Sequence, residues 1–288
     1  MGTYGRLLRL TLVSCYKDNI LGIAKGAAYS ALLSFFPVLT SLTAILVQAN
    51  ALAVSRNLSA LVFSVVPPGT EEIVQYNFTE RGQRPLTLIV FAILVSIWAA
   101  SGVIMSLMEG FRAAYRIPKG RTFWQQRGMA ALLVVIAVFP LVLASALIVF
   151  GTRVELWILT RTGVVEQGER LLGWLSLITE AVRLLVALAA ITMAISFLYY
   201  LGPNQPRRLR SVYPGAILAT ILWWLATTLF GWYVRNIANY NVLYGSVGAV
   251  IALLVWMYLL SIIALFGCEV NAELDRFRNS KKAAIQGA

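Results

Sequence analysis

Six long stretches of this chain contain no Asp, Glu, Lys or Arg, and each is 18 to 23 residues long. A helix of about 20 apolar residues spans the hydrocarbon core of a bilayer, so each stretch can cross a membrane. Only 12% of the 288 residues are charged, about half the share found in soluble domains. The sequence therefore predicts an all-α fold, a polytopic membrane helix bundle in a single domain, residues 1–288, with six transmembrane helices at residues 26–48, 86–108, 129–151, 184–201, 215–234 and 245–267.

The distribution of basic residues predicts the orientation of this bundle. One side holds the N-terminal segment, the connections after the second and fourth spans, and the C-terminal segment. These carry 16 of the 24 Lys and Arg residues. Cytoplasmic flanks of membrane proteins are enriched in Lys and Arg, so we expect both termini in the cytoplasm. The positive charge flanks every span on that side instead of gathering on one face, which indicates topology and no nucleic-acid partner.

Histidine is absent from the chain. This excludes histidine metal sites, Ser–His or Cys–His catalytic pairs and a histidine proton switch. The two cysteines, Cys15 and Cys268, lie near opposite ends without a metal-binding spacing, and packing residues are the favoured interpretation. We expect no metal, no cofactor and no catalytic residue.

Two regions between the spans mix charged and apolar residues. Residues 51–66 combine Leu and Phe with Arg56 and precede a Pro-Pro-Gly stop, and Thr70 after it suits a helix N-cap. Residues 152–183 place Trp157 and Trp174 among charged residues. Both regions predict interfacial amphipathic helices.

The predicted first span carries small and polar residues every three or four positions. They are Gly26, Ser30, Ser34, Pro37, Ser41, Ala44 and Gln48. Lipid does not favour such a face, so we expect it to point into the protein, with Pro37 bending the helix. Two interpretations stay open: one wall of a substrate path, or a surface for close helix packing.

The second span has a related pattern. Gly102, Ser106 and Gly110 are four residues apart, and Trp98 and Ser101 precede them. Small residues at this spacing are typical of helix contacts, which is the favoured interpretation.

Charged residues close to the spans are candidate coupling or gating groups. Glu180 and Arg183 are three residues apart before the fourth span, where they form either a submerged pair or a surface pair. Glu269 and Glu273 lie one helical turn apart after the last span, with Asn271 beside them. Two carboxylates near a dry boundary can hold a cation or share a proton, and a solvated helix end is the alternative.

Several segments together resemble the YihY/BrkB family of bacterial inner-membrane proteins. They are residues 26–37, the Trp98 to Gly102 segment, Tyr115 with residues 121–124, Pro203-Asn204, Pro214-Gly215, Tyr244-Gly245-Ser246 through Trp256 and Tyr258, and residues 267–274. The last segment is the most specific, and Cys268 stands where the family usually has Ala. The resemblance covers nearly the whole chain.

The resemblance implies a six-span protein of the bacterial inner membrane with both termini in the cytoplasm. Members have carried a ribonuclease label that looks like a misassignment, and we expect no enzyme. Family proposals concern envelope integrity, serum resistance and transport, with lipid export among them.

The function we expect is transport of a lipid or another amphipathic envelope substrate through a polar-lined groove. The alternatives are a non-transporting scaffold for envelope machinery and an ion- or proton-coupled exporter of small solutes. Expected partners are membrane lipids and envelope proteins. Candidate path residues are Tyr29, Ser30, Ser34, Pro37, Ser41, Trp98, Ser101, Gly102, Tyr244 and Ser246, and candidate coupling residues are Glu180, Arg183, Glu269, Asn271 and Glu273.

Overall fold

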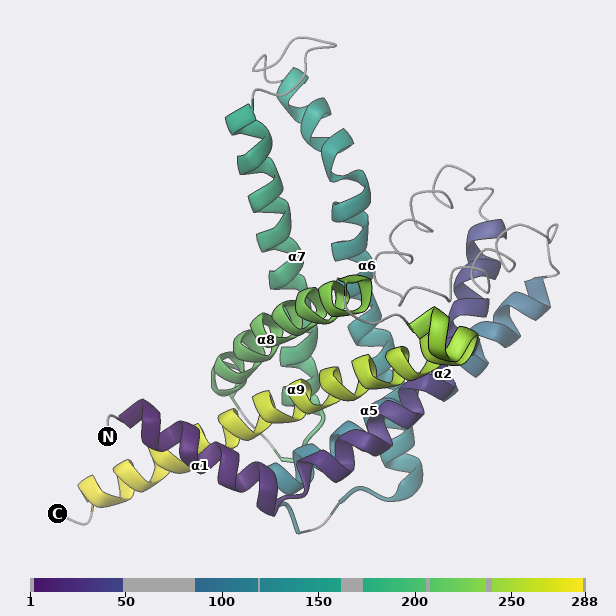
Figure 1. The fold of residues 1–288 in the computed structure, drawn as a ribbon. Coiled ribbons are helices and arrows are strands. Elements are labelled where there is room, and N and C mark those ends of the chain that lie inside the picture. The colour runs from purple at the N-terminus through teal and green to yellow at the C-terminus, as the bar shows by residue number, and fades with distance from the viewer. Residues whose placement is uncertain are drawn as a thin grey trace.

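The computed structural model describes residues 3–48, 86–118, 120–161, 173–205, 208–236 and 240–286. These residues form helices, with no strand among them (Figure 1), so the all-α prediction is confirmed. The helices are α1 (Thr3–Lys17), α2 (Ile20–Gln48), α5 (Leu86–Ala114), α6 (Phe123–Arg161), α7 (Gly173–Leu201), α8 (Leu209–Asn236) and α9 (Tyr240–Gln286).

Six of these helices are long and apolar enough to cross a membrane, which confirms the number of spans. Each predicted span lies inside one helix, but the helices extend further. α7 begins at Gly173 instead of Leu184, and α9 continues to Gln286. The predicted spans were confined to stretches without Asp, Glu, Lys or Arg, whereas Glu, Lys and Arg are good helix formers and let a helix continue into the headgroup region.

The region between α6 and α7 differs from its prediction. We expected a separate interfacial helix in residues 152–183, but residues 152–161 complete α6 and residues 173–183 begin α7. The 39 residues of α6 give a helix about 58 Å long, longer than a bilayer core is thick. The two helix ends accordingly project from the bundle as a pair (Figure 1). The other expected interfacial helix, residues 51–66, lies outside the described residues.

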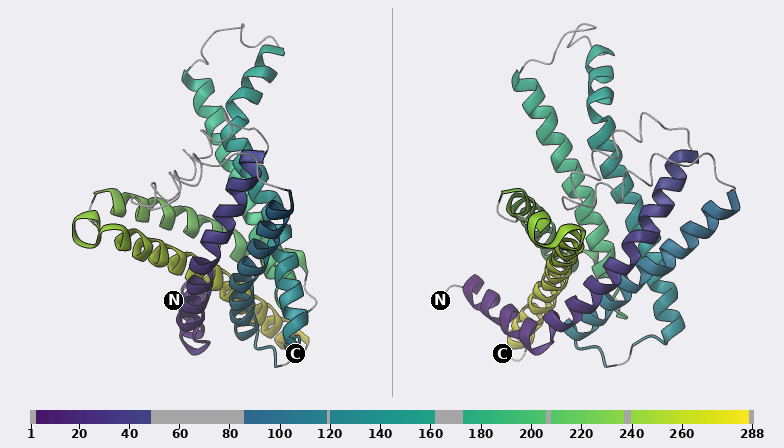
Figure 2. Two further views of the ribbon diagram at one scale, coloured as in Figure 1. Left: turned by 90° about the vertical axis from the view of Figure 1, so that its right-hand side faces the viewer. Right: turned by 45° about the vertical axis from the view of Figure 1, so that its right-hand side comes forward.

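Helices that follow each other in the sequence pack in pairs, and α9 contacts several further helices. α2 lies along α5, α6 along α7, and α8 along α9 (Figures 1 and 2). α9 also contacts α1, α2 and α5. Pro37, which was expected to bend its helix, lies inside the continuous helix α2, and Pro140 lies inside α6.

α1 is an amphipathic helix that the sequence analysis did not predict. Its polar residues Thr11 and Ser14 are buried toward the protein, whereas Leu8 and Leu12 are exposed. This arrangement suits a helix lying in the membrane interface, because the leucines then contact lipid. α1 packs on α9 near the C-terminus, so both termini lie toward the same end (Figure 2). We call this the basic end: α1, the connections 115–122 and 202–208, and α9 from Glu269 onward.

Two glycines let α8 and α9 approach closely near the basic end. A Cβ on Gly267 would lie 2.5 Å from the hydroxyl of Tyr199 and 2.6 Å from the carbonyl oxygen of Gly215. A Cβ on Gly215 would lie 2.0 Å from the carbonyl oxygen of Gly267. Neither atom fits there. Tyr199 is fully buried and donates its hydroxyl to the Ala264 carbonyl, which joins α7 to the same contact.

Candidate functional site

Part of the polar face of α2 is packed against α5. Ser34 and Ser41 are 6% and 7% exposed, and each donates to a carbonyl group of its own helix. The hydroxyl of Ser96 in α5 lies 3.0 Å from that of Ser41 and 2.7 Å from the Pro37 carbonyl oxygen. These hydroxyls are therefore satisfied within the α2–α5 contact, and α5 occupies this stretch of the face.

Closer to the basic end, Ser30 of α2 lies over Gly102 of α5. A Cβ on Gly102 would be 3.8 Å from the Ser30 hydroxyl oxygen and 3.8 Å from Nη1 of Arg127. The hydroxyl and the guanidinium therefore lie within 4 Å of the same point above the α5 backbone. Ser30 and Arg127 are both half-buried. We call Ser30, Trp98, Gly102 and Arg127 the Arg127 site.

The guanidinium of Arg127 is held by uncharged groups. Nη2 donates to the Trp98 carbonyl at 2.6 Å, Nη1 lies 3.3 Å from the Met105 sulfur, and Cζ lies 4.1 Å from the centre of the Trp98 ring. Ser101 donates to the same Trp98 carbonyl at 2.7 Å. Nε is buried and makes no hydrogen bond with any described group. This charge lies within the candidate membrane span Phe123–Val142, and Trp98 beneath it is 56% exposed.

A separate apolar cavity of about 290 Å³ lies between α2, α5, α7, α8 and α9. Its lining includes Val103, Trp223, Trp256 and Leu260. Pockets that bind small molecules start at about this volume and are lined mainly by apolar groups. The lining residues Ala31 and Val103 directly follow Ser30 and Gly102, so the cavity and the Arg127 site share α2 and α5.

Two of the predicted coupling residues meet at the basic end. Glu273 accepts a hydrogen bond from Ser14 of α1 at 2.7 Å and forms an ion pair with Arg276. Arg276 also lies 3.5 Å from Glu269 and donates to the carbonyl of Ala114 in α5. Glu269 is 0% exposed, and its Oε2 has no hydrogen-bond partner among the described groups. We call Ser14, Asp18, Glu269, Glu273 and Arg276 the acidic cluster.

The acidic cluster influences Cys15 at the end of α1. The pKa of the Cys15 thiol is raised from 9.0 to about 12. Burial is the largest cause, and the negative charges of Glu269 and Asp18 contribute to the same rise. A thiol with so high a pKa stays neutral and is a poor nucleophile. Cys15 therefore does not serve as a nucleophile in this surrounding.

Asn271, the third predicted residue of this region, faces α8. Its Oδ1 accepts from the backbone N–H of Gly215 at 2.7 Å, and its Nδ2 donates to the Val212 carbonyl at 2.8 Å. Both bonds join α9 to α8 around Pro214, which has no N–H to donate. The structure thus separates Asn271 from Glu269 and Glu273.

The structure places three other predicted residues on α7 and α2. Glu180 is exposed and Arg183 half-buried, both within α7. Tyr29 is 61% exposed on α2. Tyr244 and Ser246 belong to the first turns of α9, and their side chains fall outside what the structure describes.

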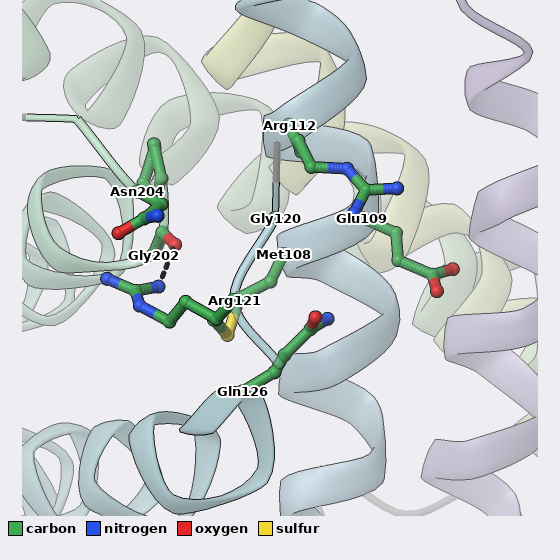
Figure 3. Close-up of a pocket in the computed structure, with 9 residues that line it drawn as sticks. Met108, Glu109, Arg112, Gly120, Arg121, Gln126, Gly202 and Asn204 are labelled. Atoms are coloured by element: carbon green, nitrogen blue, oxygen red, sulfur yellow. Dashed lines mark hydrogen bonds between the residues drawn. The ribbon is translucent and has the colours of Figure 1, made fainter. Parts of the chain in front are cut away.

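A small pocket at the basic end lies between α5, the start of α6 and the segment that follows α7 (Figure 3). It measures about 20 Å³, room for about one water molecule, and Gln126 and Asn204 line it. Arg121 donates to the carbonyls of Gly202 at 2.9 Å and Leu201 at 3.2 Å. A cation at these last carbonyls stabilises the C-terminal end of a helix. Burial lowers the pKa of Arg121.

The sequence analysis did not name Arg127, Ser14 or Asp18 as a site residue. It counted Arg127 only among the basic flanks, although Arg127 lies just two residues before an uncharged span. The spacing of Glu273 and Arg276 was a signal for an ion pair. Ser14 and Asp18 gave no signal in the sequence, because they lie far along the chain from the α9 residues of the cluster; Ser14 is 259 positions from its partner Glu273.

Comparison with known proteins decides the family. The sequence model of the virulence factor BrkB family matches residues 12–287. The chain belongs to the BrkB family. The ribonuclease-like protein YfkH of Bacillus subtilis is 32% identical over 262 residues, which cover 88% of this chain and 90% of that protein. A UPF0761 membrane protein of Alteromonas mediterranea is 29% identical over 282 residues, 96% of this chain and 90% of that protein.

Another BrkB-like relative is longer than this chain. A UPF0761 membrane protein of Alkalilimnicola ehrlichii is 26% identical over 272 residues, 93% of this chain but 58% of that protein. No solved structure matches. The BrkB assignment confirms the resemblance seen in the sequence and shows a membrane protein. Within the described part of the chain, no group of three or more His, Cys, Asp or Glu residues is placed to hold a metal ion.

Proposed function

We propose that this BrkB-family protein transports a lipid with an anionic headgroup, which binds at the Arg127 site. The observation that carries the proposal is the guanidinium of Arg127, which lies within a candidate span without a carboxylate among its described contacts. A cation at membrane depth needs a counter-charge. A lipid phosphate supplies one from the bilayer itself.

The chemistry of the Arg127 site suits a phosphate group. The Nε of Arg127 has no hydrogen-bond partner among the described groups. Guanidinium groups bind phosphate through parallel hydrogen bonds. The hydroxyl of Ser30 adds a donor near Gly102, and Trp98 offers an amphipathic ring of the kind enriched at membrane interfaces.

The apolar cavity supports a lipid over a small polar solute. Its wall is almost entirely apolar, so it accommodates an acyl chain and offers little to a sugar or an ion. Since the cavity shares α2 and α5 with the Arg127 site, we assign the headgroup to the site and an acyl chain to the cavity.

We further propose that the protein lies in the bacterial inner membrane with its basic end in the cytoplasm. The Arg127 site, near that end, then faces the cytoplasmic leaflet. The ribonuclease-like name of the Bacillus relative does not change this proposal, since this chain has no histidine to act as a base.

Binding to lipid vesicles tests the proposal. The purified protein is reconstituted with fluorescent phosphatidylglycerol or phosphatidylcholine, and both binding and movement between leaflets are measured. Losing a charge-assisted contact costs about 1.5–3 kcal/mol, so Arg127→Gln should weaken phosphatidylglycerol binding by about 10- to 100-fold. Arg127→Lys should retain part of it.

Arg210→Gln is the matched control, because Arg210 is an exposed arginine near the start of α8. It should bind and move lipid as the wild type does. Equal binding by wild type and Arg127→Gln, or equal binding of the two lipids, would contradict the headgroup assignment. Unchanged lipid movement in Ser30→Leu, together with a co-purifying envelope protein, would favour the scaffold alternative.

A further inference from the structure

Glu269 is an acid that the structure holds away from water. Its side chain is 0% exposed, and Oε2 makes no hydrogen bond with any described group. Its other oxygen, Oε1, lies 3.5 Å from Nη1 of Arg276, which is at the outer limit of a hydrogen bond. A buried carboxylate with one unpartnered oxygen is costly, and the neutral, protonated form removes that cost.

The groups around Glu269 carry more negative than positive charge. Asp18, in the turn between α1 and α2, has a buried Oδ2 with no hydrogen bond to a described group. Glu273 is the second acid on α9, and it accepts from both Arg276 and Ser14. Arg276 is the cation that these acids share, and its shorter contact is with Glu273.

The neighbouring helices add no second counter-charge to the described contacts. α1 contributes the Cys15 thiol and Ser14, and α5 contributes the Ala114 carbonyl, which occupies Nη2 of Arg276. Asn271 is engaged with α8. The acidic cluster therefore contains three carboxyl groups and one guanidinium, which contacts Glu269 and Glu273. Two negative charges would remain if all three acids were ionised.

We propose that Glu269 is a proton-binding site, which takes one proton from the solution at the basic end and holds it while α1 is packed on α9. Binding the proton forms one O–H bond on the carboxylate and reduces the charge of the acidic cluster by one. Arg276 stays paired with Glu273, and Asp18 then faces a neutral neighbour. The ligand is a proton and not a metal ion, because the described residues include no metal-binding group of three acids, cysteines or histidines. The proposal does not depend on lipid transport.

Labelling with dicyclohexylcarbodiimide tests the proposal directly. This apolar reagent attaches to protonated carboxyl groups in apolar surroundings, and mass spectrometry of peptides locates the adduct. In the full chain reconstituted in lipid, we expect an adduct on Glu269 at about pH 7, where a hydrated glutamate with a pKa of about 4.3 is ionised. Labelling should fall as the pH rises. Glu109, an exposed acid of α5, is the internal control and should carry no adduct at this pH.

Three variants separate a proton site from a carboxyl that is merely accessible. Glu269→Gln should lose the adduct. Asp18→Asn removes a neighbouring negative charge, so the loss of labelling should move to lower pH by at least half a unit. Arg276→Gln should move it to higher pH. If Arg276→Gln does not fold, the wild-type profile and Asp18→Asn still decide.

Three results would overturn the proposal. They are a folded wild type without an adduct on Glu269, labelling that does not change with pH, and labelling suppressed by sodium or potassium at constant pH. The last result would mean that Glu269 binds a metal cation.

Discussion

Arg127 and Glu269 are ionisable side chains that the helices hold against other protein groups. Arg127 rests on the ring of Trp98, and Glu269 is enclosed by α1, α5 and α9. Neither has the full set of polar partners that a charged group in water would have. Charged residues in such places usually serve function more than stability, which is why the lipid and proton proposals rest on them.

The reactivity of Cys15 reports its burial first and the charges of the acidic cluster second. Its pKa is raised to about 12 from 9.0, so at pH 8 the thiol is neutral and the thiolate fraction is about 1000-fold lower than for an ordinary cysteine. We expect N-ethylmaleimide to alkylate Cys15 at least about 100-fold more slowly in the folded protein than in detergent-unfolded protein. The Cys268→Ala variant leaves Cys15 as the single thiol for this measurement.

Folded and unfolded rates within about tenfold of each other would show that Cys15 is not shielded as the structure indicates. Raising the pH to 10 in the folded protein should accelerate alkylation, because more thiolate forms as the pH approaches the pKa. An alkylation rate that does not change with pH would also show that Cys15 is not shielded as the structure indicates.

At the scale of elements, composition predicted the helices but not all of their contacts. Six uncharged stretches placed six membrane helices, since crossing a bilayer depends on local hydrophobicity alone. α1 was not predicted, because only its contact with α9 shows which side of the helix is buried. Its leucines face outward, and its polar Thr11 and Ser14 face α9. Trp98 and Gly102 were predicted site residues, but Arg127, which they position, comes from another helix.

The close contact between α8 and α9 should be lost when Gly267 is given a side chain. Gly267→Ala would place a methyl group 2.5 Å from the Tyr199 hydroxyl and 2.6 Å from the Gly215 carbonyl, so the helices must separate. We expect a loss of at least about 2 kcal/mol in the free energy of unfolding, as for other overpacked cores. Thermal unfolding in detergent measures it.

Gly231→Ala is the control for this substitution. Gly231 lies in α8, at a position where a Cβ would meet nothing within 4 Å. Alanine favours a helix over glycine by about 1 kcal/mol, so this variant should be as stable as the wild type or slightly more stable. Equal effects of the two substitutions would show that the close α8–α9 contact is absent.

At the scale of the whole molecule, six spans bring the two ends of the chain to one side. The structure shows this directly, because α1 packs on α9. The assignment of this side to the cytoplasm follows from the excess of Lys and Arg there. The sequence thus predicted the side through its charges, and the fold supplies the pairing of the ends.

Reporter fusions test this orientation. With both termini in the cytoplasm, green fluorescent protein fused after Ala288 should fluoresce, and alkaline phosphatase at the same position should be inactive. Phosphatase fused between α2 and α5 should be active. Phosphatase activity at the C-terminus would reverse the orientation and place the Arg127 site near the outer leaflet.

The bond between Ser14 and Glu273 joins groups 259 positions apart in the chain. The ribosome must therefore synthesise the chain at least as far as Glu273 before this bond can form. Until then, the polar side of α1 has no partner on α9. The docking of α1 is accordingly a late event in the biogenesis of the bundle, because it follows the synthesis of the helices that precede α9.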